Sequence, residues 1–331
     1  MQAMRLEQPG SVEDAPLQKV ELPDPVPGAG EVAIEVEACA VCRTDLQIAE
    51  GDLEAHRRPV VPGHQVVGRV VQLGEGVSPD RLGTRVGVGW LASTCGHCDM
   101  CRRGLENLRR EATFTGWDRD GGYATRLAAR ADFCYPMPEG LAAEAAAPLL
   151  CGGIIGYRSY RLTGAGRGDR LGLYGFGASA LLVCQVAVFE GCEVYVVTRG
   201  AEARERARAA GAAWVGDLGQ RPPAPLQAAI TFAPVGSVVA AALQSLDRAG
   251  MVAVNAIHLD HIPEFPYGDL YWERRIQSVA NFTRQDSREL LELAARIPIR
   301  TSIEVHKLAD ANLALQRLKH DQVAGAAVLI P

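Results

Sequence analysis

Residues 169–180 read Asp-Arg-Leu-Gly-Leu-Tyr-Gly-Phe-Gly-Ala-Ser-Ala, a short apolar run that leads into a glycine-rich turn. The turn fits the pattern Gly-x-Gly-x-x-Ala. Gly175 permits a tight bend, Gly177 lets a pyrophosphate approach the backbone, and the small Ala180 allows a helix to pack closely on the strand. An apolar helix and a second strand ending at Val197 are expected to follow. The stretch therefore predicts a Rossmann-type, doubly wound parallel sheet that binds a dinucleotide.

The residues after that second strand bear on which dinucleotide is bound. An NAD-specific site places an Asp or Glu here to hold the ribose 2′-hydroxyl, and that carboxylate would repel a 2′-phosphate. This chain has Thr198 and Arg199 instead. A hydroxyl and a guanidinium suit a phosphate, so the sequence favours NADP(H). If Arg199 is only a solvated loop residue, NAD(H) or both cofactors would serve.

Alternating strand and helix patterns continue after this point, as a parallel sheet requires. A helix at 201–210 ends at Gly211, and strands at 228–234 and 250–255 flank a helix at 237–246. The final stretch is expected to contain a helix at 286–295 capped by Asp286 and Ser287, a second helix at 309–319, and a strand at 326–330.

The first half of the chain contains a possible metal site. Three separated stretches carry it: Cys-Ala-Val-Cys-Arg-Thr-Asp-Leu at 39–46, Pro-Gly-His-Gln at 62–65 and Pro-Leu-Leu-Cys at 148–151. Cys42, His64 and Cys151 supply two thiolates and an imidazole, which leaves one position of a tetrahedral zinc open, as in catalytic sites. Taken singly, each has an ordinary explanation, since a free cysteine is commonly a small buried hydrophobe.

The neighbours of Cys42 strengthen the metal interpretation. Asp45 could accept the second N–H of His64 and so fix the tautomer that presents the other nitrogen to a metal. Thr44 offers a hydroxyl where a substrate alcohol would gain or lose its proton. Arg43 is a permanent cation suited to a cofactor phosphate. Strands expected around these residues make this half β-rich: 17–22, 31–38, 66–73, 85–88 and 123–127.

Four motifs occur in a fixed order: Cys-Arg-Thr-Asp, Gly-His-Gln, Cys-Gly-x-Cys-x-x-Cys and Pro-Leu-Leu-Cys-Gly-Gly. In this order they resemble the zinc-containing medium-chain alcohol dehydrogenases, and especially the bacterial cinnamyl-alcohol-dehydrogenase-like branch. The resemblance implies an α/β protein with a chaperonin-10-like, β-rich catalytic domain at 1–151, a Rossmann domain at 152–284, and a return to the catalytic domain at 285–331.

The cysteine-rich loop departs from the family pattern. In the family it carries four cysteines that bind a structural zinc, whereas here Cys95, Cys98 and Cys101 are followed by Arg109 at the fourth position. A structural zinc prefers four closed ligands. Two interpretations stay open, because the loop is either metal-free or completed by a substitute ligand. The candidate substitutes are His97, Asp99, Glu106 and Glu111.

The resemblance also implies a chemistry and its further residues. Hydride would pass between an alcohol or aldehyde and NAD(P)(H), with catalytic zinc acting on the substrate oxygen and Thr44 passing the proton. Leu53, Trp90 and Trp117 would line the substrate pocket, although Trp117 could equally be a core aromatic. Phe232 and Ile257 would lie near the nicotinamide. Gln47 stands where many relatives have a relay histidine, and the family usually forms dimers or tetramers.

Composition excludes other classes of partner. The chain has 331 residues, a net charge of -5 and no clustered basic stripe, which argues against nucleic acid. No apolar run approaches the roughly 18 residues of a membrane span, and the N-terminus lacks a signal pattern. The nine cysteines are therefore expected to be thiols and metal ligands, and the location cytoplasmic.

Two rival functions fit the same architecture. A zinc-free quinone or enone reductase would share the two-domain plan, but the complete Cys42, His64 and Cys151 set argues against it. A non-catalytic NADP(H)-binding protein would need an inert zinc site, and the intact Thr44 and Asp45 give no sign of one.

Overall fold

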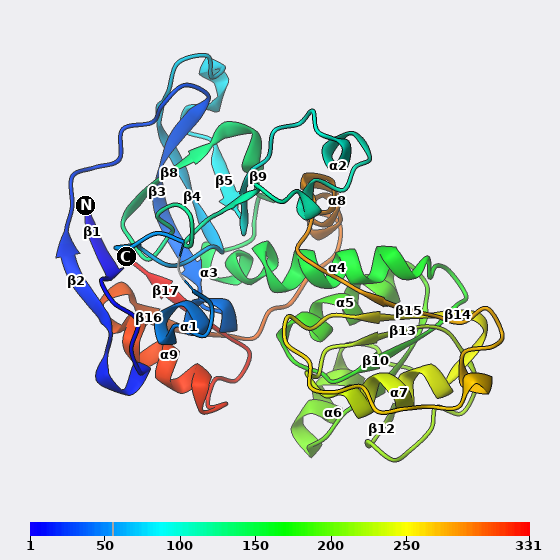
Figure 1. Cartoon of the computed structure of the whole chain (residues 1–331). Coiled ribbons are helices and arrows are strands. Elements are labelled where there is room, and N and C mark those ends of the chain that lie inside the picture. Colours follow the sequence, from blue (N-terminus) through cyan, green and yellow to red (C-terminus); the bar gives the residue numbers. More distant parts are fainter. Residues whose placement is uncertain (55) are drawn as a thin grey trace. The chain divides into compact units, whose positions relative to one another are not determined.

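The computed structural model describes residues 1–54 and 56–331, which form two compact units (Figure 1). Unit 1 comprises Met1–Cys151, Thr283–Ala295 and Arg300–Pro331, and unit 2 comprises Gly152–Phe282 and Arg296–Ile299. Each unit has its own sheet and its own buried core. No helix in the described part of the chain is long and apolar enough to cross a bilayer.

Unit 1 is built on a seven-stranded sheet with the order β16-β17-β3-β4-β5-β9, in which β8 also pairs with β3. Its strands are β3 (Glu31–Ala40), β4 (Val66–Leu73), β5 (Arg85–Val88), β8 (Arg126–Arg130), β9 (Cys134–Pro136), β16 (Ile303–Lys307) and β17 (Ala326–Ile330). The red C-terminal strand β17 lies antiparallel beside the blue β3 (Figure 1). The alternating sequence of β3 places Val32, Ile34 and Val36 in the core.

Short elements surround this sheet. They are β1 (Gln2–Leu6), β2 (Leu17–Glu21), α1 (Arg43–Glu50), β6 (Leu91–Ser93), α2 (Asp99–Arg102), β7 (Thr113–Phe114), α3 (Ala143–Ala146), α8 (Arg284–Ala294) and α9 (Ala311–Lys319). Single 3-10 turns are η1 (Val12–Asp14), η2 (Pro79–Arg81), η3 (Glu106–Leu108), η4 (Ala131–Phe133), η5 (Ala147–Leu150) and η7 (Leu308–Asp310).

Two predicted boundaries in unit 1 are wrong. The strand expected at 123–127 begins only at Arg126. The helix expected to start at Asp286 and Ser287 is capped earlier, by Thr283, whose side chain accepts a hydrogen bond from the Asp286 amide. The Asp286 carboxylate accepts one from the Thr283 amide in return. The cap residue of this reciprocal capping box thus lies three residues before the predicted one, and α8 begins at Arg284.

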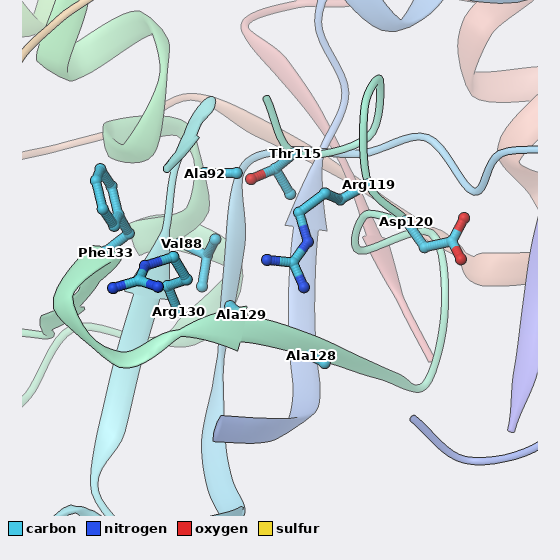
Figure 2. A pocket seen from close by; sticks show the side chains of 9 residues that line it. All are labelled: Val88, Ala92, Thr115, Arg119, Asp120, Ala128, Ala129, Arg130 and Phe133. Carbon is cyan, nitrogen blue, oxygen red and sulfur yellow. The ribbon is translucent and has the colours of Figure 1, made fainter. Parts of the chain in front are cut away.

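A small pocket lies in unit 1 beside β5 and β8 (Figure 2). Arg119 reaches into it and forms an ion pair with Glu31 at the start of β3. Val88, Ala92 and Phe133 supply much of its apolar lining. Neither group of described side chains that could hold a metal ion includes a residue that lines this pocket.

Unit 2 is a six-stranded parallel sheet with the order β12-β11-β10-β13-β14-β15. Its strands are β10 (Arg170–Tyr174), β11 (Glu193–Val197), β12 (Trp214–Gly216), β13 (Leu226–Thr231), β14 (Leu246–Val254) and β15 (Arg275–Ser278). Its helices are α4 (Gly152–Thr163), α5 (Ala178–Phe189), α6 (Ala201–Ala209) and α7 (Gly236–Gln244), with the 3-10 turn η6 (Tyr267–Asp269).

This strand order is that of the dinucleotide-binding Rossmann fold, with the reversal between β10 and β13. A buried cluster that includes Val197, Val239 and Val252 forms part of its core. Helices α4 and α5 pack closely, since a Cβ on Gly156 would lie 2.6 Å from Val183. The predicted fold class, a β-rich unit joined to a Rossmann unit, is confirmed.

Candidate active site

Cys42 lies at the junction of β3 and α1, where it is the N-cap of the helix. Its sulfur accepts a hydrogen bond from the Thr44 amide at 3.3 Å, and the Asp45 carboxylate accepts one from the Cys42 amide at 2.9 Å. These two bonds satisfy amides that a helix start otherwise leaves unpaired. The cap therefore fixes the position of the Cys42 sulfur.

His64 lies close to Cys42 because β3 and β4 are antiparallel neighbours. Cys39 pairs with Val66, so the end of β3 and the start of β4 meet. The preceding Gly63 has φ +96°, and a Cβ there would lie 2.4 Å from the ring of the buried Tyr123. Only glycine fits this turn without displacing that ring.

A second segment holds the same turn in place. The amides of Gly121, Gly122 and Tyr123 donate to the carbonyls of Val61, Gly63 and Pro62, at 2.7, 2.8 and 2.9 Å respectively. The Tyr123 amide thus binds the histidine turn, while residues 123–125 meet β1 through the bridge between Ala3 and Ala124 and the bond from the Thr125 amide to the Gln2 carbonyl at 2.9 Å. The strand that pairs with β3 therefore begins only at Arg126.

Asp45 lies behind His64 and is completely buried. One carboxylate oxygen is 3.1 Å from His64 Nδ1 and accepts from the Gly63 amide at 3.2 Å. A carboxylate can only accept here, so we assign the proton to Nδ1, which leaves Nε2 as the free nitrogen. His64 Nε2 is 3.2 Å from Cys42 Sγ.

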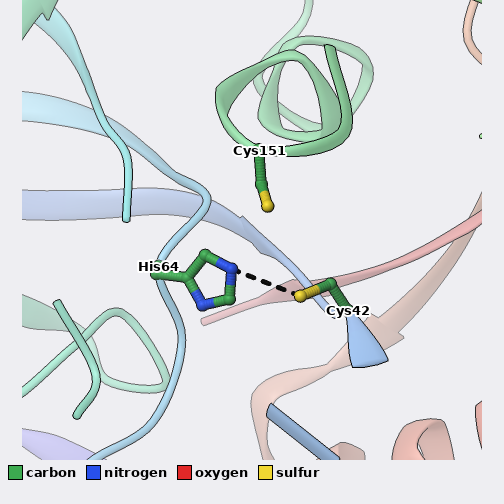
Figure 3. A group of neighbouring side chains, drawn as sticks. All are labelled: Cys42, His64 and Cys151. Atoms are coloured by element: carbon green, nitrogen blue, oxygen red, sulfur yellow. Dashed lines mark hydrogen bonds between the residues drawn. The ribbon is translucent and has the colours of Figure 1, made fainter. Parts of the chain in front are cut away.

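Cys151 completes the cluster at the end of unit 1. It follows η5, whose Leu150 is fully buried, and a Cβ on Gly87 of β5 would lie 2.5 Å from that leucine. The ligand atoms of Cys42, His64 and Cys151 all lie within 4.8 Å of one another. Figure 3 shows the three side chains converging on one point from three different segments.

The donor set fits a catalytic zinc. Two sulfurs at about 2.3 Å and one nitrogen at about 2.0 Å from zinc would lie some 3.5–3.8 Å apart in a tetrahedron, which agrees with the observed grouping. The hydrogen bond from the Cys151 thiol places the pKa of the Cys42 thiol well below its usual value, although burial opposes this shift. Cys42 therefore readily supplies a thiolate, the form that binds metal.

The charges around His64 act in the opposite direction from its burial. Burial disfavours the charged imidazolium, but the Cys42 and Asp45 charges outweigh it and raise the pKa of His64 well above its usual value. Below that pKa the ring is doubly protonated, and a metal must displace the proton that Nε2 then carries, so we expect metal affinity to fall at low pH.

Thr44 and Gln47 follow Cys42 on α1. Thr44 is buried, with 7% of its surface exposed. The Oε1 atom of Gln47 is also buried, and it has no hydrogen-bond partner in the described part of the chain. Both side chains thus offer hydrogen-bonding groups close to Cys42 in the sequence.

Aromatic rings cover one side of His64. Trp90 meets the imidazole edge-on at 4.8 Å between centroids and stacks on Phe114 at 5.0 Å and Trp117 at 5.7 Å. Trp117 in turn stacks on His56 at 3.8 Å. The structure thus brings Trp90 and Trp117 together beside His64, and their place in a substrate pocket stays a prediction. Phe114 and His56 were missed because no local pattern marks them.

The predicted cofactor residues in unit 2 lie around the turn between β10 and α5. Gly175 has φ +92°, and Gly177 is the N-cap of α5 with open space where a Cβ would be. Ala180 is fully buried in α5. The strand, turn and helix thus have the arrangement that a pyrophosphate site needs.

The end of β11 holds the residues predicted to select the cofactor. Thr198 is buried and its amide donates to Gly216 at 3.0 Å, while Arg199 is exposed. A second cation that the sequence pattern did not single out, Arg204 on α6, donates to the Thr198 carbonyl at 3.5 Å and pairs with Asp217 at 3.1 Å.

The remaining predicted residues vary in exposure. Phe232 is half-buried and its amide donates to Tyr174 at 2.8 Å, whereas Ile257 is 75% exposed. Arg43 is exposed and forms an ion pair with Asp321. Leu53 is half-buried three residues after α1, and its amide donates to the Gln47 carbonyl at 3.1 Å.

The three cysteines of the loop after β6 also gather. The sulfurs of Cys95, Cys98 and Cys101 lie within 4.8 Å of one another, and those of Cys95 and Cys101 are 3.9 Å apart. Amides of His97 and Cys98 donate to Cys95 and lower the pKa of its thiol to about 6. Burial lowers the pKa of the Arg109 guanidinium, but the negative charge of the same sulfur outweighs it and raises that pKa.

A β-rich unit with a Cys-His-Cys cluster and a Rossmann unit in one chain define the class of medium-chain dehydrogenases and reductases. Residues 28–139 match the model of the alcohol dehydrogenase GroES-like domain. The chain is 47% identical to a probable alcohol dehydrogenase, AdhA, of Mycobacterium tuberculosis, over 100% of this chain and 97% of the relative. The chain belongs to the zinc-containing medium-chain alcohol dehydrogenase family.

Solved structures share the whole architecture. A cinnamyl alcohol dehydrogenase of Sorghum bicolor matches with a TM-score of 0.87 and 26% identity, over 99% of this chain and 97% of that one. An acetophenone reductase of Geotrichum candidum, in complex with NAD, matches with a TM-score of 0.84 and 26% identity, over 100% of this chain and 97% of that one.

Proposed function

We propose that this protein interconverts an alcohol with its aldehyde or ketone by hydride transfer to or from a nicotinamide cofactor, with zinc held by Cys42, His64 and Cys151. The observation that carries the proposal is the grouping of these three ligand atoms within 4.8 Å, with the Asp45 carboxylate behind the imidazole. When bound, zinc supplies Lewis acidity toward the substrate oxygen.

The residues around the cluster take defined roles in this proposal. Asp45 holds His64 with Nε2 toward the metal position and increases its strength as a ligand. Thr44 carries the substrate hydroxyl proton away or returns it. Gln47 cannot titrate, so the relay ends in a cofactor hydroxyl and water. Alcohol oxidation would therefore slow at low pH.

The cofactor is held by unit 2 in this proposal. The backbone at Gly175 and Gly177 receives the pyrophosphate, with Ala180 giving the close strand–helix packing. Phe232 and Ile257 of unit 2 are proposed to lie at the nicotinamide, and Arg43, which belongs to unit 1, is the cation proposed for a cofactor phosphate.

Cofactor choice rests on Thr198 and Arg199, and on the neighbouring Arg204. A hydroxyl and guanidinium groups without a carboxylate on the strand end favour the 2′-phosphate of NADP(H). The NAD complex of the acetophenone reductase indicates that the fold also accepts NAD, so selectivity depends on these side chains. The ratio of kcat/KM for NADPH and NADH measures it directly.

We propose a bulky, apolar substrate that carries an aromatic ring. Trp90, Trp117 and Phe114 stack beside His64, and flat rings pack well against such a surface. Leu53, three residues after α1, is proposed to add apolar lining. The two solved relatives are named for aryl substrates, a cinnamyl alcohol and acetophenone. Aromatic aldehydes should therefore be reduced with higher kcat/KM than acetaldehyde.

We further propose a homodimer or homotetramer that forms through unit 2. Strand β15 ends its sheet, and Tyr267, Tyr271 and Trp272 nearby are 71%, 57% and 44% exposed. An uncovered strand edge next to exposed aromatic rings is a common site of self-association. Light scattering coupled to size-exclusion chromatography measures the mass.

The test is hydride transfer by the purified protein, followed by NAD(P)H absorbance with a panel of alcohols and aldehydes. Cys42→Ala should abolish turnover while leaving NADPH binding, measured by fluorescence titration, largely intact, because the pyrophosphate turn is in unit 2. Cys134→Ala, at a buried cysteine outside the cluster, is the matched control and should keep activity. Wild-type turnover in Cys42→Ala would contradict the proposal.

A further inference from the structure

The loop of Cys95, Cys98 and Cys101 has the shape of a metal site with one ligand too few. Among the described residues, the group of clustered ligand atoms contains these three sulfurs and no fourth His, Cys, Asp or Glu. A structural zinc site is normally closed by four protein ligands. The three thiols alone do not meet that requirement.

Each side chain that could replace the missing ligand has another partner. His97 Nδ1 is 2.8 Å from the Cys95 carbonyl oxygen. The remaining three are carboxylates paired with arginines: Asp99 with Arg103 at 3.3 Å, Glu106 with Arg284 at 2.7 Å, and Glu111 with Arg109 at 3.1 Å. A metal would have to break one of these contacts to gain a fourth ligand.

Arg109 takes the place of the metal charge. Its guanidinium pairs with the Glu111 carboxylate at 3.1 Å. Burial lowers the pKa of this guanidinium, but the negative charge of the nearby Cys95 sulfur outweighs it and raises that pKa. A fixed cation at this point balances a thiolate and repels a divalent ion. The residues here therefore do not fit the structural zinc that the family implies.

The loop is anchored without a metal. The Glu106 carboxylate accepts from the Arg284 amide at 2.8 Å and from its guanidinium at 2.7 to 3.1 Å, and it also accepts from Thr94 at 3.2 Å. Glu106 is buried, with 7% of its surface exposed. This cluster connects the loop to α8 inside unit 1.

We propose that the loop is an oxidisable dithiol site, in which Cys95 and Cys101 form a disulfide on exposure to a hydroperoxide. Their sulfurs are already 3.9 Å apart, and both side chains are partly exposed. Rotation of the two side chains must shorten this distance to the roughly 2.0 Å of a disulfide.

The reaction balances with the hydroperoxide as oxidant. The Cys95 thiolate attacks the terminal peroxide oxygen, the O–O bond breaks, and an alcohol leaves after taking a proton, which gives Cys95 sulfenic acid. The Cys101 sulfur then attacks the Cys95 sulfur, and water leaves with the thiol proton. Two electrons pass from the two thiols to the peroxide, and a thiol reductant reverses the change.

Mass spectrometry of the full-length protein tests this. After brief peroxide treatment, alkylation and trypsin digestion, peptide 86–102 should lack about 2 Da and carry one alkyl group, on Cys98. Cys101→Ser should abolish the mass loss, and the matched Cys98→Ser should keep it. Three alkylated cysteines in the treated wild type, or a mass loss that persists in Cys101→Ser, would overturn the proposal.

Zinc content gives an independent test. Arg109→Cys restores four thiols, so it should bind about one zinc more per chain than wild type and resist the oxidation. Arg109→Lys keeps a cation and should bind no more zinc than wild type. A second zinc in untreated wild type, or no gain in Arg109→Cys, would contradict the role assigned to Arg109.

Discussion

Replacing Asp45 with asparagine removes the carboxylate behind His64 while the side-chain volume stays nearly constant. The variant therefore tests how much this carboxylate contributes to the proposed metal site. One Asp45 oxygen serves His64 and the Gly63 amide, and the other accepts from the Cys42 amide. In Asp45→Asn the side-chain NH₂ group must face either His64 and the Gly63 amide or the Cys42 amide. An NH₂ group cannot accept a hydrogen bond, so it leaves the N–H donors on that side unpaired. A buried unpaired donor costs about 1–3 kcal/mol of stability.

The functional loss should exceed what this destabilisation explains. Removing the carboxylate behind a metal-ligating histidine typically lowers metal affinity or activity by about 10- to 100-fold, which is about 1.4–2.7 kcal/mol. We expect two quantities each to decrease by a factor in this range. They are kcat/KM for aldehyde reduction and the zinc affinity measured by chelator competition. The matched control is Asp80→Asn, at an exposed carboxylate in η2, which should change neither. A folded Asp45→Asn variant within twofold of wild type in both measurements would refute the reasoning.

Three further predictions follow from other residues. Thr198→Asp should lower the NADPH/NADH ratio of kcat/KM by tenfold or more, roughly, since a carboxylate repels the 2′-phosphate; an unchanged ratio would remove Thr198 from this role. Gln47→His should raise the rate of alcohol oxidation below about pH 7 relative to wild type, because a histidine can relay the proton; superimposable pH–rate profiles would argue against a relay through this position. Glu106→Gln should lower the free energy of unfolding by about 1–3 kcal/mol at pH 7 in urea titrations. Burial raises the pKa of Glu106, but the Arg284 contacts outweigh it and lower that pKa overall. The contribution of the ionised Glu106 carboxylate to the free energy of unfolding is therefore complete above the usual glutamate pKa of about 4.3. It is lost as the pH falls through the lowered pKa of Glu106. A difference from wild type that persists at pH 2 would contradict this origin.

The Rossmann unit was predictable because its signals are local. Within about 20 residues the chain contains the apolar strand, the turn at Gly175 and Gly177, and the following helix. The spacing of the glycines and apolar residues in this stretch is enough to predict how the strand and the helix pack. Boundaries were less accurate where a side chain caps the element. At α8, the Thr283 capping box lies before the Asp286 and Ser287 pair that seemed to mark the start.

The metal cluster could be predicted only in part from the sequence. The residue types of Cys42, His64 and Cys151 suggested ligands, but their convergence depends on β3–β4 pairing and on η5, which join segments far apart in the chain. The ring stack involving Phe114 and His56 is likewise non-local, and so is the support of the histidine turn by 121–123. No local sequence pattern predicts such contacts.

The most direct test of the central claim is zinc content, measured by elemental mass spectrometry together with aldehyde reduction, on protein purified without chelators or added metal. The account predicts about one zinc per chain in wild type. It also predicts that zinc and turnover are lost together in Cys42→Ser and in Cys151→Ser. A wild-type protein that reduces substrates with no zinc, and whose rate added zinc does not change, would contradict it and indicate a zinc-free reductase on the same fold.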